Sequence, residues 1–116
     1  MPSLNAKEYA NFESIKHISD DLPEFWYARE LAPALKYMRW ENFLKVINKA
    51  MIACQNSGYD VLQCFREVTK TSKMPNGGVK QVIDYELTRY ACYLIVQNGD
   101  PRKEVYSQRV NFRIDF

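Results

Sequence analysis

The sequence predicts a small single α+β domain, and three features of the 116-residue chain support that prediction. Residues 40–58 repeat apolar side chains at the helical period and end in Asn-Ser-Gly, which is typical of an amphipathic helix and its stop signal. Residues 66–83 are rich in valine and threonine around a Pro-Asn-Gly-Gly turn, which predicts a β-hairpin. Residues 84–98 are apolar around the whole helical circumference, so we expect a buried helix there.

Composition excludes several classes of protein. The formal charge of +2 is too small to establish a polyanionic partner, because nucleic-acid binding depends on where the charges lie. The three cysteines, at positions 54, 64 and 92, have no cysteine or histidine at metal-ligand spacing, so we expect reduced, buried thiols and neither a metal site nor a disulfide framework. No apolar run approaches the ~18 residues that span a bilayer. We therefore expect a soluble, cytoplasmic protein without a cofactor.

The N-terminal third is predicted to contribute a β-hairpin. Residues 1–11 have no clear period and are expected to be loosely ordered. From Phe12 onward, FESIKHI and EFWYA flank the polar turn SDDLP and favour two short strands.

A pair of helices should follow this hairpin. Residues 28–38 place apolar side chains at spacings of four and three, with Pro33 tolerable if it falls in the first turn. Together with the helix at 40–58 they have the form of a helix-turn-helix unit, whose second helix would present its polar face to DNA. Lysine neutralises phosphate and asparagine can pair with adenine, although the same residues also suit a merely solvated face. The candidates on this helix are Lys45, Asn48 and Lys49.

The predicted hairpin at 66–83 is strongly basic. A short helical turn from Val61 should precede it, and no acidic residue lies between Glu67 and Asp84. Positive ribbons of this sort commonly reach along phosphate backbones; alternatively, the lysines keep an exposed sheet edge soluble. The basic candidates are Arg66, Lys70, Lys73 and Lys80.

The run from Asp84 to Glu104 combines a cysteine, three tyrosines and two arginines, yet its pattern indicates a structural helix. Asp84 is a plausible N-cap, and Asn98-Gly99 before Asp-Pro is a strong stop signal. Cys92 has no histidine near it in sequence, so we expect a packing residue and no nucleophile. With no phosphate-cradling loop and no metal-ligand spacing either, we expect no enzymatic activity. Within the run of residues 84–104, the side chains expected to contribute to a binding surface are those of Arg89, Arg102 and Lys103.

Two blocks of the chain resemble the N-terminal domain of the BRO family, which includes phage antirepressors and proteins of the DNA-damage response. They are FWYARELAPALKYMRWENF, residues 25–43, and GGVKQVIDYELTRYACYLIVQNGDPRK, residues 77–103. The run LTRYACYLIVQNGDP is the most recognisable part. The resemblance spans roughly residues 12–105 and implies a DNA-binding domain whose basic hairpin and helix pair contact the nucleic acid.

One position and one segment depart from the family pattern. Lys36 stands where the family usually has glycine, so the turn after the first helix of the pair could be set differently. Residues 106–116 alternate apolar and polar side chains where relatives continue into another helix, so we expect a terminal strand that pairs with the sheet or with another subunit.

Two functions are therefore predicted from the sequence. The first is a non-catalytic DNA-binding domain of a phage-type or damage-response regulator. The alternative is a protein-interaction module of the antirepressor kind, anchored by the apolar tail and by surface aromatics at Phe25, Trp26 and Tyr27.

Overall fold

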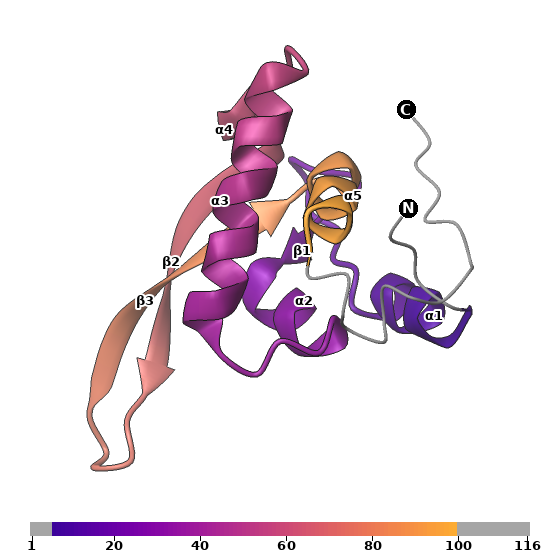
Figure 1. Cartoon of the computed structure of the whole chain (residues 1–116). Coiled ribbons are helices and arrows are strands. Elements are labelled where there is room, and N and C mark those ends of the chain that lie inside the picture. Colours follow the sequence, from indigo (N-terminus) through magenta and orange to yellow (C-terminus); the bar gives the residue numbers. More distant parts are fainter. Residues whose placement is uncertain (1–5, 100–116) are drawn as a thin grey trace.

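The computed structural model describes residues 6–99, which form five helices and one three-stranded antiparallel sheet (Figure 1). The predicted α+β class is confirmed. In chain order the elements are α1 (Ala6–Ser14), β1 (Trp26–Tyr27), α2 (Ala28–Ala34), α3 (Trp40–Asn56), α4 (Val61–Cys64), β2 (Phe65–Lys73), β3 (Val79–Leu87) and α5 (Arg89–Gln97). Arg102, Lys103 and the expected strand at 106–116 lie outside the described residues.

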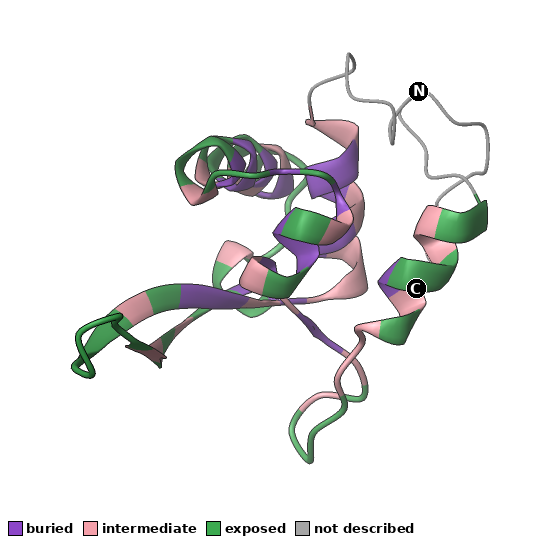
Figure 2. Cartoon of the chain, turned by 90° about the horizontal axis from the view of Figure 1, so that it is seen from below, coloured by how far each residue is buried: buried purple, intermediate pink, exposed green. Residues whose placement is uncertain are grey.

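The β2–β3 hairpin projects from the body of the domain, and its distal half is largely exposed (Figures 1 and 2). The strands are in register from Phe65 opposite Leu87 to Lys73 opposite Val79. β1 pairs with β3 only at the Leu87 end, so the rest of the ribbon has no third strand in the described structure. The hairpin and its turn are confirmed. β3 runs four residues further toward α5 than predicted, and β2 begins one residue earlier.

Helix α3 is the longest helix of the described structure and packs against α5 (Figure 1). Its predicted bounds are confirmed, because a clear helical period and a glycine stop are local signals. The buried stripe is centred on Phe43, Ile47 and Ala50, all fully buried, whereas Met51 on the predicted apolar face is half-buried. The three predicted contact residues of this helix are exposed.

Helix α5 begins at Arg89, and not at Asp84 as predicted. Thr88 is the N-cap, and its hydroxyl accepts a hydrogen bond from Ala91 N at 3.2 Å. Residues 84–87 belong to β3 because at this end of the hairpin they pair with β2, and the last two also with β1. Cys92 is fully buried and burial raises the pKa of its thiol well above the usual value, so its packing role is confirmed. Cys54 and Cys64 are likewise free and buried, as predicted.

The strand predicted from Phe12 is wrong over its first residues, because Phe12 lies in α1. Residues 6–11, for which the sequence predicts no regular structure, are also helical. Phe12 is 1% exposed and its ring stacks on Trp26 with centroids 4.3 Å apart, while the indole donates to Phe12 O at 2.8 Å. This long-range contact favours the helix and leaves only one bridge of the expected hairpin, between His17 and Phe25.

The aromatic residues before α2 do not form a surface anchor. Phe25 is 5% exposed, Trp26 is fully buried and Tyr27 is half-buried. Their prediction as exposed interaction residues is therefore wrong. Trp26 packs against Phe12 of α1, whereas the ring centroids of Phe25 and Tyr27 lie 5.2 Å apart and Tyr27 also lies under Lys70 of the hairpin.

Helix α2 ends in a complete Schellman motif. Lys36 N donates to Pro33 O at 3.0 Å and Tyr37 N donates to Ala32 O at 2.9 Å, while Lys36 has a φ of 67°. The turn is therefore set as a glycine would set it. Pro33 lies near the end of the helix and not in its first turn, and the helix ends one residue later. Met38, predicted on the apolar stripe, lies beyond the helix and is 94% exposed.

Helix α4 is a single turn. Asp60 caps it by accepting a hydrogen bond from Leu62 N at 3.0 Å. The short helical turn predicted from Val61 is therefore confirmed, although Leu62 is 79% exposed and Phe65 already belongs to β2.

Candidate nucleic-acid interface

The basic residues of the hairpin divide by strand face and by partner. Alternate residues of a strand share a face, so Arg66, Lys70 and Lys80 lie on the same face of the ribbon, opposite Glu86, Val82 and Ser72 respectively. Arg66 Nε donates to Glu86 Oε1 at 2.7 Å. This guanidinium at the base of the hairpin is therefore already paired with a carboxylate.

Lys70 also has a carboxylate partner, and it is a buried one. Its Nζ lies 2.7 Å from Asp84 Oδ2 and 3.2 Å from the centroid of the Tyr27 ring. Asp84 is fully buried, the single charged residue of which this is true among residues 6–99. A buried carboxylate needs such a counter-charge, so the charge of Lys70 is largely neutralised by the fold.

Asp84 also caps a helix, though not the one expected. Its Oδ1 accepts hydrogen bonds from Arg29 N at 3.0 Å and from Tyr85 N at 2.8 Å. The N-cap residue of α2, Tyr27, makes no side-chain capping bond. A carboxylate at a helix N-terminus satisfies a free N–H and interacts favourably with the helix dipole. Asp84 thus fixes α2 and Arg29 against the hairpin.

A groove with a volume of about 470 Å³ lies between this hairpin face and the starts of α2 and α3. Arg29 occupies its helical side: Cζ is 4.1 Å from the centroid of the Trp40 ring, and Nε donates to Ile83 O at 2.8 Å. The principal lining residues are Lys70, Ser72, Lys80 and Val82 from the hairpin and Arg29, Trp40 and Glu41 from the helices. An arginine, two lysines and an aromatic ring suit an anionic, partly aromatic ligand.

The structure brings some of the predicted contact residues together and separates others. Lys70 and Lys80 share the groove. Lys73 lies opposite Val79, on the other face of the ribbon near its tip. Lys73 and Lys80 are exposed, and neither has a carboxylate partner within residues 6–99. The α3 candidates Lys45, Asn48 and Lys49 lie on the exposed face of that helix and do not line the groove.

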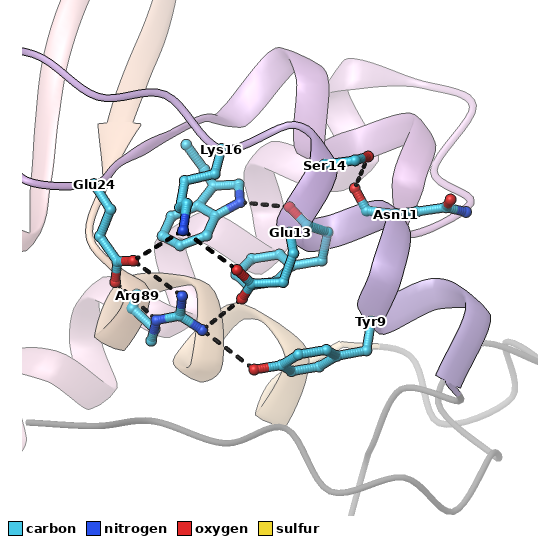
Figure 3. A network of polar contacts seen from close by, with 9 residues as sticks. Tyr9, Asn11, Glu13, Ser14, Lys16, Glu24 and Arg89 are labelled. Atoms are coloured by element: carbon cyan, nitrogen blue, oxygen red, sulfur yellow. Dashed lines mark hydrogen bonds and ion pairs between the residues drawn. The ribbon is translucent and has the colours of Figure 1, made fainter.

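Arg89 is held in a network of acidic residues instead of facing a binding surface (Figure 3). Its Nε donates to Glu24 Oε2 at 2.7 Å and its Nη1 to Glu13 Oε1 at 2.8 Å. The Arg89 hydrogen bonds lower the pKa of Glu24. Burial alone would raise the pKa of Glu13, but Arg89 and Lys16 lower it overall. The network joins α1 to α5, so the expected contribution of Arg89 to binding is replaced by a structural one.

Sequence reasoning missed Arg29 and Trp40 as site residues. Trp40 fits the apolar period of residues 40–58 and so indicates only a core position, and nothing in the local sequence distinguishes Arg29 from other surface arginines. The sequence does mark Asp84 as unusual, because it is the first acidic residue after sixteen residues without one and so a candidate partner for the basic hairpin. Across the described part of the chain there is no group of three or more potential metal ligands, and no helix there is long and apolar enough to cross a membrane.

The fold and the site define a small α+β domain with a projecting basic hairpin and an arginine–tryptophan groove at its base. Residues 14–114 match the family model described as the BRO family, N-terminal domain. The chain is also 42% identical over 94 residues to DNA damage-inducible protein D of Escherichia coli (strain K12), which covers 81% of this chain. The chain therefore belongs to the BRO family, as its two sequence blocks predict. It spans 34% of that relative's length, and no solved structure gives a significant match.

Proposed function

We propose that this domain is a non-catalytic DNA-binding module of a regulator of the phage or DNA-damage-response type. Membership of the BRO family and the name of the E. coli relative support the regulatory class. The observation that supports DNA binding most directly is the placement of two lysines, Lys73 and Lys80. Both lie on a ribbon that projects beyond the body, and neither is neutralised by an acid within residues 6–99.

The geometry of the hairpin suits a phosphate-dominated contact. A two-stranded ribbon fits the major groove of B-DNA, which is about 12 Å wide. With Lys73 and Lys80 on opposite faces of the ribbon, each can approach the phosphates on one side of that groove. The exposed lysines of α3 do not line the groove of the protein. They would add to the positive charge that attracts the DNA backbone.

Fluorescence anisotropy with a labelled 20-base-pair duplex over a range of salt concentrations tests this function. The wild-type affinity should fall steeply with salt, and Lys80→Gln should weaken binding while reducing the slope of log K against log salt by about 0.9. Lys7→Gln is the matched control, because it removes the same charge from an exposed position on α1, away from the hairpin. Absence of binding by the wild type at low salt, to duplex and to single strands alike, would refute the proposal.

A further inference from the structure

We propose that Arg29 is a preorganised phosphate clamp, and that the groove beside it holds one phosphodiester group of the bound nucleic acid. This inference rests on the proposed DNA-binding function and assigns a specific contact to a residue outside the basic hairpin. Arg29 Nη1 and Nη2 donate to two oxygens of the phosphodiester, and Lys80 faces the same group from the hairpin side of the groove.

Three contacts fix Arg29 before any ligand arrives. Its backbone N–H donates to the buried carboxylate of Asp84 at 3.0 Å, and its Nε donates to Ile83 O at 2.8 Å. Its guanidinium carbon lies 4.1 Å from the centroid of the Trp40 ring. A long side chain held in this way loses little conformational entropy on binding, which distinguishes it from the exposed lysines Lys73 and Lys80 of the hairpin.

The donors that remain have the right arrangement for a phosphate. Nε is already used, and neither Nη1 nor Nη2 makes a hydrogen bond to another residue between 6 and 99. The terminal edge of a guanidinium presents two roughly parallel N–H groups, which match two phosphate oxygens. The bond to Ile83 O thus uses Nε and leaves the edge formed by Nη1 and Nη2 available to a ligand.

The charges around the groove favour an anion. Lys70 is neutralised by Asp84, so the unpaired cations are Arg29 and Lys80, and they face a single acid, Glu41. At about 470 Å³ the groove lies within the size range of small-molecule sites, which is enough for the sugar-phosphate portion of one nucleotide.

The first test compares Arg29→Lys with Lys7→Arg, at an exposed position on α1 that does not line the groove, in the full 116-residue chain. Both variants keep the charge, but only the first removes the paired donors and the stacking on Trp40. We expect Arg29→Lys to weaken duplex binding about 10-fold, the loss of one charge-assisted bidentate contact, and Lys7→Arg to change it less than 2-fold. Equal affinities of Arg29→Lys and wild type would overturn the clamp.

The second test asks whether Arg29 recognises the phosphate or a base. A 20-nucleotide strand and an abasic deoxyribose-phosphate strand of the same length carry equal numbers of phosphates. The clamp requires Arg29→Lys to weaken binding to both strands by the same factor. A loss confined to the strand with bases would show that Arg29 contacts a base edge and would refute the clamp.

A measurement on the wild type guards against a variant that fails to fold. The chain has two tryptophans, and their indole N–H signals can be followed by NMR while the abasic strand is added. The Trp40 signal should shift, whereas that of Trp26, fully buried and bonded to Phe12 O, should not. A titration that moves hairpin resonances but leaves Trp40 unchanged would refute the clamp alone. Absence of any binding would refute the proposed function itself.

Discussion

The carboxylate of Asp84 accepts a hydrogen bond from the backbone N–H of Arg29 at 3.0 Å, across 55 residues of sequence. This bond supplies the N-terminal cap that Tyr27 cannot provide to α2, and it does so from the middle of a β-strand. The second oxygen of Asp84 lies 2.7 Å from Lys70 Nζ. One buried acid therefore holds the helix, the hairpin and the groove between them in a fixed arrangement.

Replacing Asp84 should destabilise the domain strongly. Asp84→Ala leaves the Arg29 N–H without its acceptor and Lys70 without its counter-charge, and we expect a loss of about 2–3 kcal/mol in the free energy of unfolding. Asp84→Asn keeps an acceptor oxygen for the cap and should lose about half as much. Urea denaturation followed by circular dichroism measures both. A change below about 0.5 kcal/mol for the alanine variant would contradict this role.

Lys36→Gly should stabilise the protein. Lys36 adopts a φ of 67°, a conformation that costs a residue with a Cβ roughly 1 kcal/mol relative to glycine. Part of that gain is offset because glycine has more freedom in the unfolded chain, so we expect about 0.5–1 kcal/mol. Lys45→Gly is the control, since the same change at an exposed position inside α3 should cost about 1 kcal/mol. Equal signs for the two variants in urea denaturation would show that the turn does not favour glycine.

Sequence reasoning succeeded where the determining interactions are local. The period of α3 and the Pro-Asn-Gly-Gly turn specify their elements within a few residues, and the structure has them at the predicted places. It failed where distant groups decide. Phe12 is helical because its ring packs on Trp26. Asp84 precedes α5 in sequence and was therefore predicted to cap it, but sheet pairing brings Asp84 to the start of α2 instead. The Arg29–Trp40 stack could not be found for the same reason.

Acid should weaken the attachment of α1, and Arg89 should determine how strongly. The folded-state pKa values of Glu13 and Glu24 are lowered from 4.5, so the unfolded chain binds more protons and stability falls as pH decreases through and below that value. Arg89→Gln should lower stability at pH 7 and flatten its decrease between about pH 5 and 3. Thermal unfolding midpoints over this range test it, and Arg39→Gln, which removes an equal charge from an exposed position outside this network, is the control. Identical acid limbs for Arg89→Gln and wild type would contradict the network.

Removing the acid from the groove should strengthen DNA binding. Glu41 is exposed on the first turn of α3 and lines the groove with Arg29 and Lys80, so its charge repels a phosphate placed there. Glu41→Gln should raise affinity for a duplex about 2- to 3-fold at low salt, with the gain shrinking as salt screens the charge. Asp21→Asn, which removes an equal charge from an exposed loop that does not line the groove, should change affinity less. Anisotropy titrations at two salt concentrations separate the two variants. An equal gain for both would mean that only the net charge of the domain matters and that DNA does not approach this groove.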